Sequence, residues 1–195
     1  MPASNSWITR MLHDLQSSPE AFSELYEEMK KPLYVVAYRM VLNREDAEDV
    51  VQEVFVSLLR ASNISGVKNG RAYLFQAVRN EALKRMRDGA KEIAAGDFEK
   101  LSKYRSPVQG GPSARGGSDL DLAVAALTAE ERQIVALRVN AELGYTEIAR
   151  ITGLSTATVF RKYRAAIRNL QEYFGRGQDG EQRGGKEHSD ESKNS

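Results

Sequence analysis

Near its C-terminal end the chain reads TEIARITGLSTATVFRKYRAAIRNL over residues 146–170. Ala149, Gly153 and Val159 follow one another here at spacings of four and six residues. This spacing is typical of two helices that cross closely, because alanine lets the backbones approach, glycine supplies a positive φ and valine fills the crossing. We therefore predict a helix-turn-helix in this segment.

The second helix of this motif carries four cations and no acid over residues 155–170, a local charge of +4. A recognition helix in a DNA major groove needs such cations for phosphates and a few side chains for base edges. A charged face that is merely solvated is the alternative. Phe160 lies on the outer face, where it can pack on a thymine methyl or against a protein partner. Ser155 is expected to cap this helix, and its inner stripe is expected to comprise Val159, Tyr163, Ala166, Leu170 and Phe174.

Glycines divide the rest of the chain. Eleven of the 15 fall within residues 89–118 and 175–195. The first stretch holds a GGPSARGGS run typical of a flexible linker, and the second is polar and has no aromatic residue. We predict two domains, 1–88 and 119–174, joined by a flexible linker at 89–118 and followed by a disordered tail at 175–195.

Both domains have the apolar periodicity of helices, and no stretch alternates with the period of a strand. Ser18 with Pro19, Asn43, and Thr128 with Glu131 are start signals for helices, whereas Pro32 is expected to kink or split one. The fold class is therefore predicted to be all-α. The expected helices are a short one around 7–15, a long one from 19, then 43–60, 71–87, 119–127, one from 129, 146–152 and 155–174.

The composition excludes several classes of protein. The chain has 195 residues and no cysteine, which excludes disulfides, thiolate metal sites and cysteine nucleophiles. With His13 and His188 as its two histidines, a histidine metal cluster or His-based triad is not expected. No apolar run approaches the roughly 20 residues that cross a bilayer, and no signal peptide is visible. We expect a cytoplasmic protein that is not an enzyme and that has no cofactor or metal.

The formal net charge of +1 conceals an uneven distribution. Residues 43–60, NREDAEDVVQEVFVSLLR, hold five acids against two arginines. The exposed face of this helix is therefore predicted to be acidic, with Gln52 in its middle. Solubility alone is an alternative explanation, because acids early in a helix also favour its dipole.

The helix that follows is basic. Residues 70–91, GRAYLFQAVRNEALKRMRDGAK, hold six cations against two acids, with Tyr73 and Phe75 among them. Cations with interleaved aromatics can follow a nucleic-acid backbone and stack unpaired bases. The alternative is that the two aromatics belong to the core, which we expect for one of them.

Taken in order, these segments resemble the extracytoplasmic-function (ECF) sigma factors of bacterial RNA polymerase. The resemblance covers most of residues 5–174. AFSELYEEMKKPLYVVAYRMVLNREDAEDVVQEVFVSLL is similar to the second region of the family and AYLFQAVRNEALKRMR to the end of that region. LTAEERQIVALRV and GYTEIARITGLSTATVFRKYRAAIRNL are similar to the fourth region.

The resemblance implies a subunit that directs promoter-specific initiation. Its implied partners are the core polymerase, through the β and β′ subunits, promoter DNA and an anti-sigma factor. The residues implied to bind core polymerase are Asp49, Gln52 and Glu53. Those implied to read and melt the −10 element are Asn63, Lys68, Asn69, Arg71, Tyr73, Arg79, Asn80, Lys84 and Arg87. Those implied to read the −35 duplex are Ser155, Thr156, Thr158, Phe160, Arg161, Lys162, Arg164 and Arg168.

The recognition helix departs from the family pattern Thr-Val-Lys-Ser-Arg-Leu, since residues 158–163 read TVFRKY. This departure indicates an unusual promoter or a partner that docks on this face. Two further classes remain open. One is a helix-turn-helix regulator that binds duplex without polymerase, and the other is a sigma-like adaptor.

Overall fold

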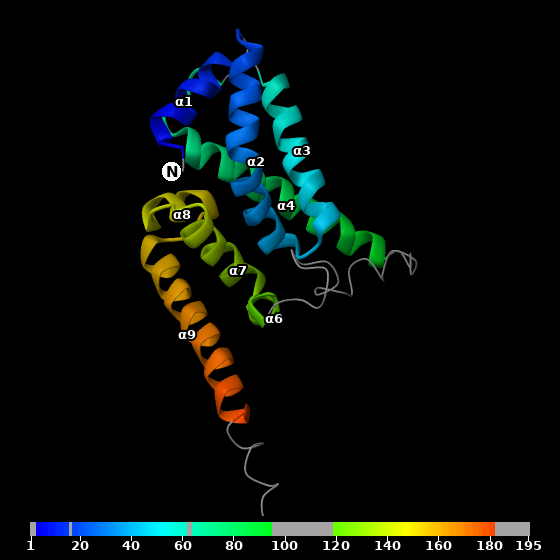
Figure 1. Ribbon diagram of the computed structural model, residues 1–195, viewed down its shortest axis with the longest axis vertical. Coiled ribbons are helices and arrows are strands. Elements are labelled where there is room, and N and C mark those ends of the chain that lie inside the picture. The colour runs from blue at the N-terminus through cyan, green and yellow to red at the C-terminus, as the bar shows by residue number, and fades with distance from the viewer. Residues whose placement is uncertain (1–2, 16, 62–63, 95–118, 182–195) are drawn as a thin grey trace, which may run out of the picture.

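The protein was analysed as a computed structural model that describes residues 3–15, 17–61, 64–94 and 119–181 (Figure 1). All the elements assigned in these ranges are helices, so the prediction of an all-α fold is confirmed. They are α1 (Asn5–Asp14), α2 (Pro19–Val41), α3 (Arg44–Arg60), α4 (Gly70–Ala94), α6 (Asp119–Ala125), α7 (Ala129–Val135), the π-helical segment η1 (Ala136–Asn140), α8 (Tyr145–Thr152) and α9 (Thr156–Glu181).

The predicted start signals cap their helices. The side chain of Ser18 accepts a hydrogen bond from the backbone of Ala21, and that of Asn43 accepts one from Asp46. Thr128 and Glu131 form both hydrogen bonds of a capping box. Local sequence therefore sets where these three helices begin, because each cap satisfies backbone N–H groups that the first turn leaves unpaired.

Pro32 lies inside α2, which continues through it without a break, so of the two expected effects, a kink or a split, the split does not occur. A proline inside a helix costs about 3 kcal/mol. Its neighbours Met29 and Leu33 are almost completely buried in the core. Tertiary packing of this face outweighs the lost hydrogen bond.

Two helices continue beyond their predicted ends. α4 reaches Ala94 instead of residue 87, and α9 reaches Glu181 instead of residue 174. The helix therefore occupies the first residues of the predicted linker and of the predicted tail. Glycine costs only about 1 kcal/mol in a helix, so isolated glycines such as Gly89 and Gly175 do not end one. Residues 95–118 and 182–195 lie outside the described ranges.

Helices α1 to α4 form one bundle (Figure 1). Ile8, Leu25, Val54 and Phe75 come from the four helices in turn and are all at least 97% buried. Burial of each such side chain contributes about 1.5–3 kcal/mol, so the shared core holds the helices together. The bundle fixes the acidic helix α3 beside the basic helix α4.

The predicted helix-turn-helix is present as α8 and α9. Gly153 has a φ of 75°, and its N–H donates to the carbonyl of Ala149 at 2.9 Å. Val159 is completely buried at the crossing, and Ser155 Oγ accepts a hydrogen bond from the backbone of Thr158. The three residue types that predicted the motif thus have the expected roles.

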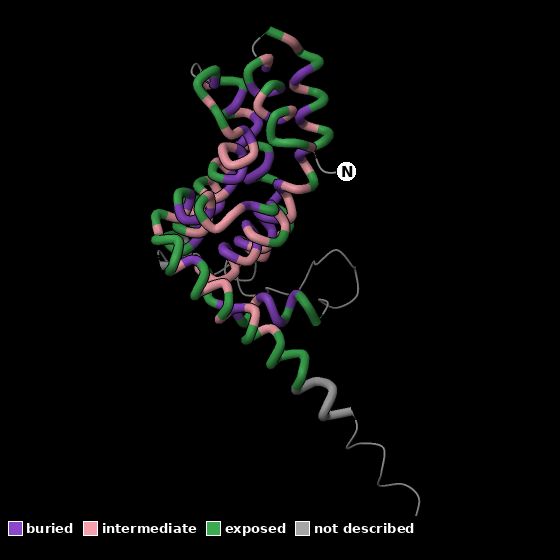
Figure 2. The backbone as a smooth tube through the Cα atoms, turned by 90° about the vertical axis from the view of Figure 1, so that its left-hand side faces the viewer, coloured by how far each residue is buried: buried purple, intermediate pink, exposed green. Residues whose placement is uncertain are grey.

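The far end of α9 projects away from the other helices (Figure 2). Phe174 is 41% exposed and Tyr173 is 39% exposed. The expectation that Phe174 completes the inner stripe was therefore wrong, because α9 continues past the short helices α6 and α7 that pack against it (Figure 1). Val159 and Ala166 of that stripe are fully buried.

The two halves of the chain pack against each other. α2 contacts both α7 and η1, and the start of α4 contacts α8. Buried residues from both halves, such as Val36 and Leu137, belong to one continuous apolar cluster. The two helical domains that the sequence predicts are thus in contact with each other in this structure.

No helix among the described residues is long and apolar enough to span a bilayer.

Candidate functional site

A groove of about 380 Å³ runs between α3 and α4. Asp49, Gln52 and Glu53 of α3 line one side of it. Gln52 is exposed and Glu53 is half-buried. The three residues predicted to bind core polymerase therefore lie together on one accessible surface, which we call the α3–α4 groove.

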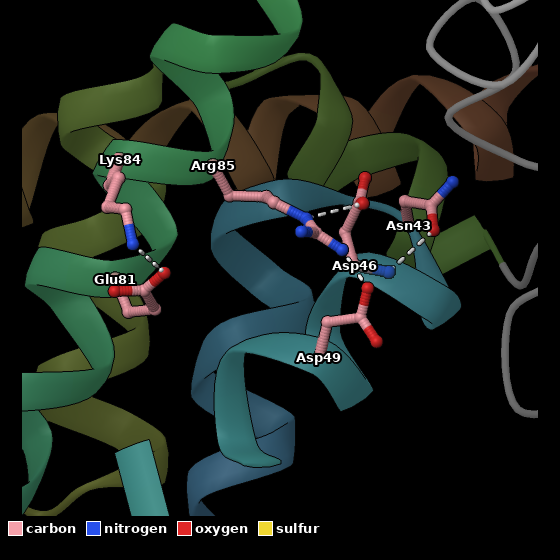
Figure 3. Close-up of polar contacts among 6 residues, drawn as sticks. All are labelled: Asn43, Asp46, Asp49, Glu81, Lys84 and Arg85. Carbon is pink, nitrogen blue, oxygen red and sulfur yellow. Dashed lines mark hydrogen bonds and ion pairs between the residues drawn. The ribbon is translucent and has the colours of Figure 1, made fainter. Parts of the chain in front are cut away.

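Arg85 of α4 also lines this groove, and its guanidinium lies between Asp46 and Asp49 (Figure 3). Its Nε donates to Asp46 Oδ1 at 3.0 Å, and its Nη2 contacts Asp49 Oδ2. The Asp46 side chain is only 4% exposed, whereas that of Asp49 is 52% exposed. One arginine thus neutralises a buried acid and also orients an acid at the surface. Sequence reasoning did not select Arg85, because its acidic partners lie 36 and 39 positions away.

Lys84 also lines the α3–α4 groove, although it was predicted to bind the −10 element. Its ammonium group donates to Glu81 Oε1 at 3.0 Å, and this hydrogen bond raises the pKa of Lys84 (Figure 3). The groove therefore presents cations as well as acids to a partner. The prediction for Lys84 remains untested.

Residues at the start of α4 form hydrogen bonds and an ion pair with the second half of the chain. Asn69 Nδ2 donates to Glu147 Oε1 of α8 at 2.6 Å. Arg71 Nε donates to the carbonyl of Ala141 at 2.8 Å, and the same guanidinium pairs with Glu142 at 3.5 Å. Two residues predicted to contact −10 DNA thus have protein partners in this structure.

The other predicted −10 residues lie along the loop before α4 and on α4 itself. Lys68, Asn80 and Arg87 are exposed, Tyr73 is half-buried, and Asn63 lies outside the described ranges. Phe75 is completely buried, which confirms that one of the two aromatics belongs to the core. Arg79 is half-buried: burial lowers the pKa of its guanidinium, and its Nε has no hydrogen-bond partner among the described residues.

The outer face of α9 is exposed and basic. The helix has no acidic residue from its first residue, Thr156, up to Glu172. Lys162 is a cation of this face whose ammonium group forms an ion pair within the protein, with Glu130 of α7 at 2.6 Å. The predicted −35 residues that are exposed are Ser155, Thr156, Phe160, Arg161, Arg164 and Arg168, and Thr158 is half-buried.

Phe160 is supported by an aromatic residue that sequence reasoning missed. The ring of Tyr145, the first residue of α8, contacts both Phe160 and Tyr163 edge-on. Arg138 lies over the Tyr145 ring at 4.9 Å, and Arg164 lies over Phe160 at 5.9 Å. The pairing arises from the helix-turn-helix crossing, so it has no local sequence signal.

Two family descriptions match the chain. Residues 25–92 match "Sigma-70 region 2", and residues 118–170 match "Sigma-70, region 4". Together they cover more than half of the chain. The first match contains α3 and the part of α4 that lines the groove, and the second contains the helix-turn-helix up to residue 170.

Curated relatives are ECF sigma factors. The chain is 26% identical over 163 residues to the ECF RNA polymerase sigma factor SigE of Mycolicibacterium smegmatis, an alignment that covers 82% of this chain and 63% of SigE. It is 26% identical over 167 residues to the ECF sigma factor SigK of Mycobacterium tuberculosis, covering 77% of this chain and 84% of SigK. The chain thus spans less than two thirds of the length of SigE.

Two solved structures share the fold. One is the sigma factor RpoE of Bartonella quintana in complex with the anti-sigma factor NepR, with a TM-score of 0.61 and 23% identity over 78% of this chain and 98% of that chain. The other is CnrH in complex with the cytosolic domain of CnrY, with a TM-score of 0.59 and 19% identity over 88% of this chain and 97% of that chain. With both sigma-70 regions in order, and with relatives of this kind, the chain belongs to the ECF sigma factors of the sigma-70 family.

Proposed function

We propose that the chain is a promoter-specificity subunit that binds core RNA polymerase, reads the −35 duplex and melts the −10 element. The observation that carries this proposal is the presence of both sigma regions in one chain, each with its own charged surface. Such a protein acts in the bacterial cytoplasm and catalyses no reaction itself. An anti-sigma factor is its proposed regulator, since both solved relatives are bound to one or to a partner's cytosolic domain.

The α3–α4 groove is the proposed surface for the β and β′ subunits. The exposed Asp49 and the half-buried Glu53 beside Gln52 fit a partner that presents cations and amides, because such pairs are complementary and form charge-assisted hydrogen bonds. Asp49 is held towards this surface by Arg85 instead of turning freely in solvent. The solubility explanation does not require an acid to be fixed in this way.

The outer face of α9 is the proposed reader of the −35 duplex. Arg161, Arg164 and Arg168 are all exposed along it, and such cations can contact phosphates while the first turn approaches base edges. The ion pair between Lys162 and Glu130 removes one cation from this set in the free protein. We expect Lys162 to contribute less than the three arginines.

The proposed −10 surface comprises the loop before α4 and the exposed side of α4. Unstacking a base costs a few kcal/mol, which stacking on Tyr73 and hydrogen bonds from residues such as Asn80 must offset. We infer that binding energy drives the melting. We expect Arg79, which lies half-buried on the same helix, to contribute to this binding as well.

In this proposal residues 1–88 form the polymerase-binding and −10 domain, and residues 119–174 form the −35 domain. Residues 89–118 connect them, with α4 carrying the first domain on to Ala94. The connection makes binding of the second element intramolecular, so two weak contacts combine into a strong one.

The affinity of the chain for core polymerase tests the groove assignment. We expect the double variant Gln52→Ala/Glu53→Ala to bind core polymerase at least tenfold more weakly than the unaltered chain. The matched control is Gln171→Ala/Glu172→Ala, which removes the same two residue types from an exposed position on α9. Equal binding by the groove variant and the control would contradict the assignment.

A further inference from the structure

Asp46 is a buried acid near the start of α3. Its side chain is only 4% exposed. Its backbone N–H donates to Asn43 Oδ1 at 3.0 Å, so the capped first turn of α3 fixes its position. A carboxylate that is withdrawn from water is costly unless a cation or several hydrogen-bond donors accompany it. Asp46 therefore needs a partner, and the partner has to come from another element.

Arg85 of α4 is that partner. Its Nε donates to Asp46 Oδ1 at 3.0 Å. Val78 and Ala82, which precede it on the same helix by seven and three positions, are completely buried in the core. Turning α4 so that Arg85 moved away from α3 would expose this apolar surface to water. Arg85 is thus held by the packing of its own helix and by the buried acid.

The same guanidinium also reaches a second acid of α3. Its Nη2 contacts Asp49 Oδ2, and Figure 3 shows the guanidinium between the two carboxylates. Asp46 and Asp49 are three positions apart, a spacing at which side chains are neighbours on a helix surface. The N–H groups of a guanidinium are fixed in one plane, so one arginine can bridge two neighbouring carboxylates.

This bridge sets the direction in which Asp49 points. The Asp49 side chain is 52% exposed, and an unheld side chain at such a position exchanges between rotamers. With Oδ2 held by Arg85, the other carboxylate oxygen is directed away from Arg85 (Figure 3). Asp49 lines the α3–α4 groove together with Gln52 and Glu53. A side chain that is already fixed has less conformational freedom to lose when a partner binds.

Lys84, the neighbouring cation in the groove, is arranged differently. Its ammonium group donates to Glu81 Oε1 of its own helix at 3.0 Å, whereas Arg85 reaches across to α3. The contact of Lys84 therefore orders two side chains of α4. That of Arg85 orders an acid on the opposite side of the groove.

We propose that Arg85 is a positioning residue for the binding of core polymerase. Anchored on Asp46, it holds Asp49 in the orientation that polymerase recognises. The inference rests on the proposed function, and it adds a residue that acts through Asp49 and not through a contact of its own with polymerase. It follows that the fork geometry of the guanidinium, and not its charge alone, sets the affinity for polymerase.

Arg85→Lys separates the two roles of this side chain. Lysine keeps the positive charge and can neutralise Asp46, but its single ammonium nitrogen does not reproduce the fork that bridges both carboxylates. We expect the full chain with this change to bind core polymerase about two- to tenfold more weakly, which corresponds to the cost of immobilising one side chain. Fluorescence anisotropy of the chain labelled at its N-terminus measures this affinity.

Two further measurements distinguish positioning from a general effect on the fold. The urea midpoint of unfolding and the affinity for the −35 duplex should stay close to those of the unaltered chain. The matched control is Arg10→Lys, the same change at an exposed position of α1, which should leave polymerase binding unchanged. An equal loss of duplex and polymerase affinity by Arg85→Lys would assign the residue to stability alone and overturn the positioning role.

A double-mutant cycle shows whether the effect passes through Asp49. Asp49→Ala should weaken polymerase binding by itself. In that background Arg85→Lys should weaken binding by less than about twofold more, because no carboxylate is left to position. The same loss on Arg85→Lys in both backgrounds would overturn the proposal, since Arg85 would then act by another route.

The groove assignment itself is separated from this inference by the variant Gln52→Ala/Glu53→Ala. If that variant binds polymerase weakly and Arg85→Lys binds as tightly as the Arg10→Lys control, the positioning role alone is overturned. If the groove variant and Arg85→Lys both bind normally, the proposed polymerase surface is wrong and the positioning role fails with it.

Discussion

Tyr145 meets the exposed ring of Phe160 edge-on, with the ring centroids 5.4 Å apart and the planes at 90°. The contact crosses the turn of the helix-turn-helix, so α8 holds an apolar side chain of α9 in place on a basic surface. Phe160 is 45% exposed, which leaves one side of its ring open to a ligand. Such a fixed ring is suited to the 5-methyl group of thymine in a major groove.

Phe160→Ala is therefore expected to weaken binding to the −35 duplex by about fivefold, because a contact of this size contributes about 1 kcal/mol. Replacing thymine by uracil in the duplex should weaken binding of the unaltered chain and leave binding of the variant unchanged. Fluorescence anisotropy with the two duplexes measures both effects. If the unaltered chain does not distinguish thymine from uracil, Phe160 serves a protein partner.

The exposed arginines of α9 are expected to act through phosphates. Arg161→Ala and Arg164→Ala should each weaken −35 binding and lower the slope of log K against log salt by about 1. Affinity for core polymerase should stay the same. Arg164→Ala also removes the cation over Phe160, so it should have the larger effect. Normal promoter binding by both variants would assign this face to another partner.

The buried acid of α3 is predicted to matter for stability. Asp46→Ala removes the partner of Arg85 Nε and is expected to lower the free energy of unfolding by about 1–3 kcal/mol, as for a lost hydrogen bond to a charged group. Glu27→Ala removes an ion pair with Lys30 at the surface and should change the free energy of unfolding by less than about 1 kcal/mol. Urea unfolding followed by circular dichroism compares the two. If both variants lowered the free energy of unfolding by the same amount, the contact between Asp46 and Arg85 would contribute no more to stability than a surface ion pair.

Gly70, at the start of α4, offers a second matched pair. A Cβ there would lie 2.8 Å from the backbone nitrogen of Thr9 in α1, so α1 would have to shift. Gly70→Ala is expected to destabilise the fold by about 1–3 kcal/mol. At Gly66 a Cβ would meet nothing within 4 Å, so Gly66→Ala should be neutral to within about 0.5 kcal/mol. Thermal unfolding of both variants checks this, and equal stability would refute close packing of α1 against α4.

The sequence predicted those features that depend on neighbouring residues. The caps at Ser18, Asn43 and Thr128 and the turn at Gly153 are confirmed, because each forms between residues at most four positions apart. The helix ends were predicted less well, since a glycine in a packed or growing helix is only a weak stop signal.

The features that the sequence did not predict depend on contacts between residues that lie far apart in the sequence. Asn69 meets Glu147 across 78 positions and Arg39 meets Asp121 across 82. The types of two side chains at such separations do not indicate that they are partners, because many other pairs of polar and charged residues are equally compatible with the sequence. The same reason explains why Arg85 and Tyr145 were not selected as parts of the binding surfaces. The residue assignments for polymerase and DNA themselves remain predictions.

Transcription from genomic fragments by purified core polymerase tests the central claim most directly, with 5′ ends mapped with and without the chain. The account predicts new 5′ ends that require the chain, that share upstream elements near −10 and −35, and that disappear with Gln52→Ala/Glu53→Ala. The contradicting result is that no 5′ end depends on the chain although it binds duplex DNA by itself, which would make it a polymerase-independent regulator.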